Sequence, residues 1–393
     1  MHGTSPVTLQ TAALRYEKHP VAAYRMLGGL RFSLAMMVVC GHTFALTYGN
    51  GPRFFIAEIG MGSVAVNGFF VLSGFIIAEA VHLFYTGRPG AFLINRGLRL
   101  IPPFWAATLV SILVHAWLSR LGVLKLPDYE FVPASIFAPE NLIAQLTAII
   151  PIFNLNRVLG DMREAYYFTR FAWAVFVEFV FYFVYAAAMF CWSWACWAMS
   201  LRTFALAWGG GFLALHVFND YVRPVYWVLP YTPYFVLGCS LYFVRVSGDR
   251  AAKFLALISY VLVGLHFFRY IQGQTGMSMQ AVYGIARPRV LVPWLMMLGL
   301  PFVLMWLASL QVSQRAARVD KWLGDLTYPL YLNHYAVVVA IWSLVDQRSW
   351  AIQALAIGLA LILSYVMKLA IDVPVASLRD WVRGLRLLEA KTA

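Results

Sequence analysis

Ten long apolar segments, separated by shorter polar ones, constrain this 393-residue chain more than any other feature of its sequence. Each has roughly the ~17–25 residues that a helix needs to cross a bilayer. Only 12% of the residues are charged, against about 25% in a soluble domain, so most of the chain does not face water. The sequence therefore predicts an all-α fold, a polytopic transmembrane helix bundle of about ten spans. The segments are 30–47, 62–83, 101–121, 171–195, 203–219, 230–246, 254–271, 290–310, 326–345 and 350–371.

Two parts of this pattern are weaker than the rest. Gly209, Gly210 and Gly211 interrupt the fifth segment. The stretch at residues 141–155 is apolar but short, so it is expected to be interfacial or re-entrant.

The distribution of basic residues gives the orientation of the bundle. If the ten helices alternate, most of the 30 Lys and Arg residues fall on the side of the N-terminus, which predicts that both termini are cytoplasmic. The expected organisation is a cytoplasmic tail at 1–26, a transmembrane domain at 27–378 and a basic cytoplasmic tail at 379–393. The net charge of +13 is scattered between apolar segments, so it indicates loop bias and no nucleic-acid partner. All four cysteines lie in apolar segments, and no disulfide framework is implied.

Two of the eight histidines stand out because ionisable groups inside a span are costly and are functional candidates by default. His42 lies eleven residues after Arg31, about 16 Å along a helix and near the middle of a bilayer. His334 lies about 14 Å beyond Asp325 on a span running in the same direction, so both imidazoles should reach similar depth. The alternative is that they are unrelated packing residues. The packing interpretation is favoured for three further histidines that each stand alone among apolar residues, His115, His216 and His266.

Polar side chains continue on the helix that carries His334. In LGDLTYPLYLNHY, Tyr328, Tyr331 and Tyr335 follow the helical spacing of three and four residues. A polar stripe at the depth of His42 indicates an interior cavity.

Arg96 and Arg99 lie in FLINRGLRLIPPFW and share a face if this segment is helical. Two interpretations stay open: topogenic charge at the cytoplasmic edge, or a guanidinium pair that binds phosphates. Pro102 and Pro103 are then expected to bend the chain at the membrane entrance.

Glu178 is a lone carboxylate among the aromatic residues of FAWAVFVEFVFYF. Its distance from Arg202 predicts a position in the outer half of its span, with Arg170 as a candidate structural partner. In VAVNGFFVLSGFII, the glycines and Ser73 permit close helix approach, and no base at fixed spacing supports Ser73 as a nucleophile. A zinc-binding helix motif and a CxxC motif are both missing, so no metal is expected.

Five blocks in this order resemble the acyltransferase 3 family of integral membrane acyltransferases, and the resemblance extends from about residue 25 to 380. The sequence departs from the usual residues of this family at three positions: Gly28 and Asn67 stand where Asp is usual, and Asp372 stands where Glu is usual. The blocks are LGGLRFSLAMMVVCGHT, VNGFFVLSGFII, INRGLRLIPPFW, WAVFVEFVFY and LGDLTYPLYLNH.

The resemblance implies transfer of an acyl group, most often acetyl, from cytoplasmic acyl-CoA to a hydroxyl. The implied acceptor is a carbohydrate, glycan or small hydroxylated molecule on, or bound for, the outer face of a bacterial inner membrane. Acyl-CoA and the acceptor are the expected partners, together with membrane lipid. The candidate residues are His42, Glu178 and His334 for catalysis, Arg31, Arg96 and Arg99 for acyl-CoA, and Tyr328, Tyr331, Asn67 and Ser73 for the substrate cavity.

One alternative from another class stays open on the sequence. A transporter or flippase of a lipid-linked or anionic amphiphile would use the same cavity without chemistry, and the basic residues would recognise the headgroup. Release of free CoA from acetyl-CoA distinguishes the two.

Overall fold

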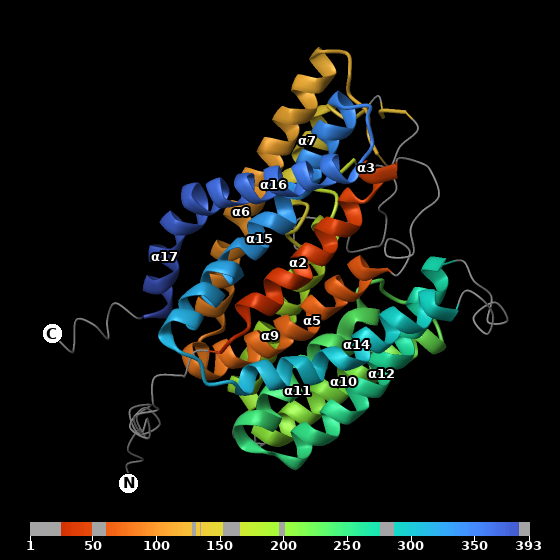
Figure 1. Ribbon diagram of the computed structural model, residues 1–393. Coiled ribbons are helices and arrows are strands. Elements are labelled where there is room, and N and C mark those ends of the chain that lie inside the picture. Colours follow the sequence, from red (N-terminus) through yellow and green to blue (C-terminus); the bar gives the residue numbers. More distant parts are fainter. Residues whose placement is uncertain are drawn as a thin grey trace, which may run out of the picture.

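The computed structural model describes residues 25–48, 60–127, 131–133, 135–151, 166–195, 201–275 and 287–384 (Figure 1). Within these ranges all regular secondary structure is helical. The longer helices are α2 (Gly28–Thr43), α5 (Met61–Ala80), α6 (Pro89–Arg120), α9 (Ala172–Ala195), α10 (Leu201–Tyr221), α11 (Thr232–Ser247), α12 (Arg250–Thr275), α14 (Arg287–Ser309), α15 (Gln314–Leu344) and α16 (Trp350–Met367). The shorter ones are α3 (Ala45–Tyr48), η1 (Val81–Tyr85), α7 (Pro139–Thr147), η2 (Leu229–Tyr231), η3 (Lys368–Asp372) and α17 (Val373–Arg383).

A long helix coincides with each of the ten predicted apolar segments. Six helical stretches of the described chain are long and apolar enough to cross a membrane, which identifies a multi-pass membrane protein. They are Met61–Tyr85, Pro89–Arg120, Ala172–Ser193, Arg250–Gly273, Val290–Ser309 and Trp350–Arg383.

The prediction of ten spans is therefore supported in part, and three of the four differences in the described chain have a physical reason. α2 and α11 have only 16 residues each, which is short for a span. α15 is long enough, but its first turns are charged and Asn333 and His334 interrupt its apolar part. Nearly all of α15 from Leu326 to Val339 is buried, so these polar groups face protein and not lipid.

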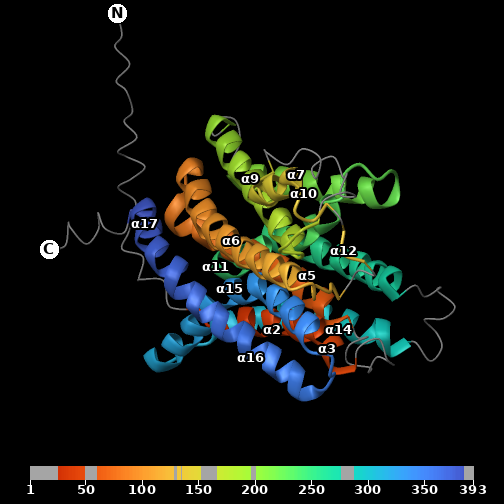
Figure 2. The ribbon, with the colours of Figure 1, turned by 90° about the horizontal axis from the view of Figure 1, so that it is seen from above.

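The helices α2, α5 and α15 form the centre of the bundle. α15 packs against α2, α6 and α16, while α5 packs against α2, α11 and α14 (Figure 1). α10, α11, α12 and α14 lie on one side of this centre, and α6, α16 and α17 lie on the other (Figure 1). Seen from above, α16 and α17 follow one another along the edge of the bundle (Figure 2). Polar residues of α2, α5 and α15 therefore meet in the interior, as expected where the surrounding helices supply the apolar surface.

Two segments differ in detail from the sequence-based expectations. α6 begins at Pro89 and continues through Pro102 and Pro103, so Arg96 and Arg99 lie on the same continuous helix as the third span. The apolar stretch after residue 138 forms the short helix α7, where the Leu146 carbonyl accepts a hydrogen bond from Trp105 Nε1 at 2.8 Å.

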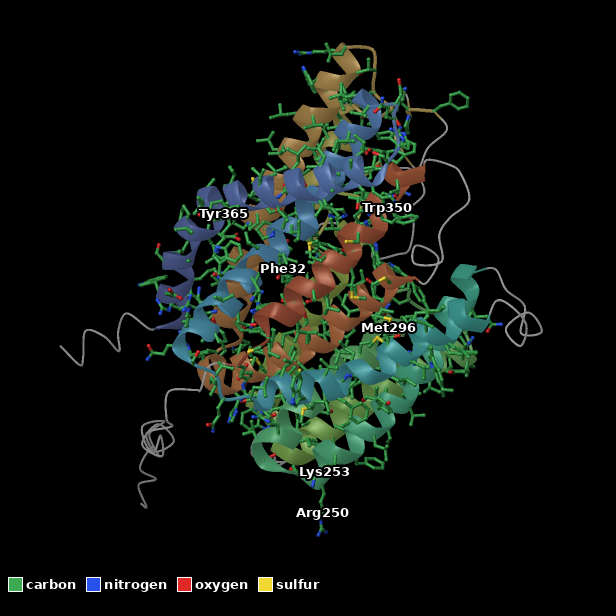
Figure 3. All side chains as sticks on the ribbon, viewed as in Figure 1. Phe32, Arg250, Lys253, Met296, Trp350 and Tyr365 are labelled. Atoms are coloured by element: carbon green, nitrogen blue, oxygen red, sulfur yellow. The ribbon has the colours of Figure 1, made fainter. Side chains whose placement is uncertain are left out.

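Both ends of the described chain lie at the same end of the bundle. Arg25 forms an ion pair with Glu79 near the end of α5, and Arg88 Nη2 donates to the Val382 carbonyl of α17 at 3.2 Å. Arg245, near the end of α11, interacts electrostatically with Arg25 and Glu79 and so lies at this end as well. Arg250 and Lys253 follow at the start of α12 and project from the bundle (Figure 3). This end is therefore rich in basic side chains. α17 continues to Arg383, beyond the boundary at 378 expected for the transmembrane domain.

Glycines permit a very close helix contact in the bundle, between α5 and α11. A Cβ on Gly238 would lie 1.9 Å from the Val71 carbonyl oxygen, and one on Gly74 would lie 2.2 Å from that of Phe235. Because these obstacles are backbone atoms, no side-chain rotation relieves them. The two helices can approach this closely only with glycine at both positions.

Gly238→Val should therefore force α5 and α11 apart and lower the stability of the solubilised protein by about 1–3 kcal/mol or more. The measurement is the thermal midpoint together with the monodisperse fraction after solubilisation. Gly210→Val is the matched control, because a Cβ on Gly210 meets no atom within 4 Å. Equal behaviour of the two variants would refute the close contact.

Candidate active site

The two histidines singled out by the sequence touch. His42 on α2 and His334 on α15 share a hydrogen bond of 2.9 Å between Nδ1 and Nε2. Phe171, just before α9, stacks on His42 with ring centroids 3.7 Å apart and on His334 at 5.1 Å. His334 is fully buried, whereas His42 is half-buried. The prediction that they reach similar depth is confirmed.

The hydrogen bonds assign the tautomer of each imidazole. Nδ1 of His334 lies 3.3 Å from the Leu330 carbonyl oxygen, which can only accept, so Nδ1 carries the proton. Nε2 of neutral His334 then accepts a hydrogen bond from the Nδ1–H of His42. Nε2 of His42 consequently retains its lone pair. The pair is arranged so that His42 can accept a proton or act as a nucleophile.

His42 lines a cavity of about 640 Å³, which we call the histidine cavity. Its walls come from the end of α2, the start of α5, Phe171, Trp173 and Tyr270, and the start of α16. Arg170, next to Phe171, lies within electrostatic reach of His42. The pairing of Arg170 with Glu178 stays a prediction.

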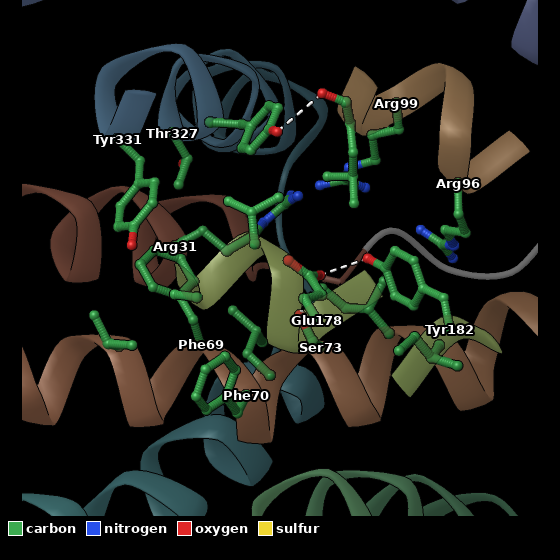
Figure 4. Close-up of a pocket in the computed structure, with 18 residues that line it drawn as sticks. Arg31, Phe69, Phe70, Ser73, Arg96, Arg99, Glu178, Tyr182, Thr327 and Tyr331 are labelled. Carbon is green, nitrogen blue, oxygen red and sulfur yellow. Dashed lines mark hydrogen bonds between the residues drawn. The ribbon is translucent and has the colours of Figure 1, made fainter. Parts of the chain in front are cut away.

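A second cavity, which we call the arginine pocket, lies toward the basic end of the bundle (Figure 4). Its volume is about 90 Å³, room for a few water molecules and not for a whole substrate. Arg96 is buried and Arg99 half-buried, and both guanidinium groups belong to this pocket. The predicted site residues that line it are Arg31, Ser73, Arg96, Arg99, Glu178, Tyr328 and Tyr331.

Glu178 shares this pocket with the arginines. Its carboxylate accepts hydrogen bonds of 2.6 Å from Ser73 Oγ and 2.5 Å from Tyr182 OH. The Tyr182 ring also lies 5.4 Å below the Arg96 guanidinium (Figure 4). α9 continues to Ala195, about 25 Å beyond Glu178, so the carboxylate lies in the first half of this helix. This agrees with the predicted position in the outer half of the span, because the alternation of the helices starts α9 on the outer side.

Val66 and Tyr331 line both cavities and form part of the wall between them. Tyr331 OH donates to the Phe171 carbonyl at 3.0 Å, and Tyr328 OH donates to the Leu100 carbonyl at 3.0 Å. Both phenols are thus bonded to backbone. His42 does not line the arginine pocket, so a molecule held by the arginines reaches the imidazole only past Tyr331.

Several candidates lie elsewhere. Asn67 is fully buried, its Nδ2 donates to the Ser63 carbonyl at 2.9 Å, and it lines neither cavity. Tyr335 packs beside His115, away from both cavities. His115 lies 2.7 Å from the Ser111 carbonyl and 2.8 Å from Tyr166 OH, which confirms a packing role.

His216 and His266 do not each stand alone, contrary to the sequence-based expectation. Their ring centroids are 5.9 Å apart, and His216 Nδ1 lies 3.9 Å from the Asp220 carboxylate. They come from α10 and α12, whose pairing the sequence spacing did not reveal.

Gly28 has a steric reason to be glycine. Its backbone N–H donates to Asp320 Oδ2 at 2.7 Å, and that of Gly29 donates to Oδ1 at 2.6 Å, so this carboxylate caps α2. A Cβ on Gly28 would lie 1.8 Å from the Asp320 carbonyl oxygen. The glycine that replaces the usual Asp at position 28 therefore leaves room for the close approach of α15 to α2. Asp372, the departure near the C-terminus, interacts with Arg99 and lies on the arginine side.

Sequence reasoning missed Phe171, Tyr182 and Asp320, and it named Arg170 only as a candidate partner of Glu178. Phe171 and Tyr182 lie in an aromatic-rich stretch where one ring cannot be told from another. Arg170 and Asp320 border predicted spans, where charged residues are expected for topology alone.

Long apolar helices around a buried polar site define a multi-pass membrane protein whose ionisable groups face the bundle interior. The sequence profile of the acyltransferase 3 family, described as an acyltransferase domain, matches residues 26–369. The chain therefore belongs to this family and is a membrane acyltransferase. The comparisons with curated proteins and with solved structures found no match.

Proposed function

We propose that this acyltransferase takes an acyl group, acetyl first among the candidates, from cytoplasmic acyl-CoA. The acceptor in this proposal is a hydroxyl of a carbohydrate or glycan on, or bound for, the outer face of a cell membrane. The observation that carries the proposal is the His42–His334 hydrogen bond, with the histidine cavity on one side and the arginine pocket toward the basic end. The basic end is taken as cytoplasmic by the positive-inside rule.

In this proposal the arginine pocket receives the donor. Arg31, Arg96 and Arg99 offer planar guanidinium groups, which suit phosphate oxygens. The pocket is small as it stands, so the donor's arm enters by displacing side chains such as Tyr331. Glu178, held by Ser73 and Tyr182, can accept a hydrogen bond from an amide N–H of the arm. Glu178 is accordingly assigned to the donor and no longer to the acceptor.

The histidine cavity receives the acceptor hydroxyl. Nε2 of His42 takes the hydroxyl proton while the oxygen attacks the thioester carbonyl carbon. The carbon–sulfur bond then breaks, and the CoA thiolate recovers the proton from His42. In the second route that stays open, Nε2 attacks the thioester carbonyl carbon first and the carbon–sulfur bond breaks, which releases the CoA thiolate. The acyl group then passes from Nε2 to the hydroxyl oxygen, and the hydroxyl proton goes to the thiolate. His334 holds the ring of His42 in either route, and Arg170 is a candidate to stabilise the oxyanion.

The direct test is to incubate the purified full-length protein with acetyl-CoA and to measure free CoA thiol with and without crude envelope glycan. Glycan-dependent thiol release, with acetyl recovered on the glycan, is the expected result. A transporter or flippase would release no thiol under either condition, and that outcome would overturn the proposal.

A further inference from the structure

α17 is fixed against the part of α6 that carries Arg96 and Arg99. Asn95 Nδ2 donates to the Arg379 carbonyl at 2.9 Å, and the Asn95 side chain is fully buried. Together with the contact of Arg88 to the α17 backbone, this bond sets the position of the helix. α17, which carries Arg379 and Arg383, therefore packs against α6.

Four guanidinium groups gather at this contact. Arg379 lies within electrostatic reach of Arg96, Arg99 and Arg383. The Nε–H groups of Arg96, Arg379 and Arg383 are buried without a hydrogen-bond partner. Buried donors without a partner cost stability, so the cluster has capacity for a ligand that accepts hydrogen bonds.

The acidic side chains around α17 do not balance this charge. Asp380 lies 3.4 Å from Arg383 Nη1, and Asp372 interacts with Arg99 and Arg379. These are the carboxylates that the structure places against α17's arginines in the described part of the chain. Like charges held together at low dielectric repel, so an added anion would relieve the cluster.

The α17 arginines do not line the arginine pocket, although Arg96 and Arg99 do. They therefore extend the cationic surface away from the pocket and from His42. A CoA thioester carries its phosphates in the same order: the diphosphate follows the pantetheine arm, and the 3′-phosphate of the nucleotide lies beyond it. In this order, Arg96 and Arg99 match the diphosphate, and Arg379 and Arg383 match the 3′-phosphate.

We propose that Arg379 and Arg383 bind the 3′-phosphate of the CoA nucleotide and make the enzyme select CoA over donors that end at phosphopantetheine. This inference rests on the acyl-CoA dependence put forward as the proposed function. It adds α17, which lies beyond the family match at residue 369, to the donor site.

The test is equilibrium binding of CoA, dephospho-CoA and phosphopantetheine to the purified full-length protein. Wild type should bind CoA at least about tenfold more tightly than dephospho-CoA, as expected for a lost charged hydrogen bond. Arg379→Gln with Arg383→Gln should remove most of this difference by weakening CoA alone. Lysine at both positions should restore part of the preference for CoA over dephospho-CoA, because lysine keeps the positive charge but lacks the planar guanidinium that binds two phosphate oxygens at once.

Arg318→Gln is the matched control, since Arg318 is an exposed arginine in the first turns of α15 and should leave the CoA preference unchanged. Equal affinity of wild type for CoA and dephospho-CoA would overturn the inference without any variant. If CoA binds, and the Arg96 and Arg99 variants lose it while the α17 variants do not, the α17 assignment alone fails. If wild type binds none of the three compounds, the proposed function fails with it.

Discussion

Replacing His42 with alanine should lower acyl transfer by about 10²–10⁴-fold, the usual contribution of a positioned acid–base group. His42 is the imidazole whose Nε2 keeps a lone pair and that lines the histidine cavity. The measurement is acetyl transfer from acetyl-CoA to envelope glycan, normalised to the amount of protein in the membrane. That amount should change little, because losing the bond to His334 costs about 0.5–1.5 kcal/mol.

His115→Ala is the control for this variant. It removes a fully buried imidazole that has two hydrogen-bonding contacts, to Ser111 and Tyr166, but lines neither cavity. Transfer per folded molecule should therefore stay near the wild-type level. If His42→Ala keeps more than a tenth of the wild-type rate, His42 is neither base nor acyl carrier.

Changing Arg96 and Arg99 together to alanine should raise the KM for acetyl-CoA by about 100-fold or more and alter kcat much less. The estimate follows from losing two charge-assisted hydrogen bonds of about 1.5–3 kcal/mol each, with about 1.4 kcal/mol per decade of affinity. The readout is the initial rate of thiol release as a function of acetyl-CoA concentration.

The control is the pair Arg315→Ala and Arg318→Ala, which removes the same charge from exposed positions at the start of α15. It should leave the KM for acetyl-CoA nearly unchanged. An unchanged KM in the Arg96 and Arg99 variant would mean that these residues serve only membrane topology.

The sequence contained enough to predict the helices, because apolar segments of bilayer length have few alternatives to a spanning helix. It also predicted that His42 and His334 reach similar depth, since their distances from Arg31 and Asp325 on parallel helices are similar. The hydrogen bond between them could not be predicted, because it depends on which faces of α2 and α15 meet. Depth counting did not reveal that Glu178 shares a pocket with Arg96 and Arg99, because that contact depends on how α6 and α9 pack.

Which helix faces which could not be predicted from periodicity. The contact of Asp320 with the start of α2 and the wall formed by Val66 and Tyr331 depend on how α2, α5 and α15 pack. The same holds for the arginines of α17, which Asn95 brings to Arg96 across almost three hundred residues of sequence. Such contacts need the three-dimensional arrangement, because in an apolar bundle every helix face has similar composition.

The proposed function assigns the donor to the arginine pocket and the acceptor to the histidine cavity, so donor and acceptor are expected to enter from opposite faces of the membrane. Sealed vesicles of known orientation test this most directly, with radiolabelled acetyl-CoA on one side and envelope glycan confined to the other. Label should reach the glycan only when acetyl-CoA faces the basic end of the bundle, and the His42→Ala variant should transfer none. Transfer that requires both substrates on the same side, or that proceeds equally from either side, would contradict a two-sided site.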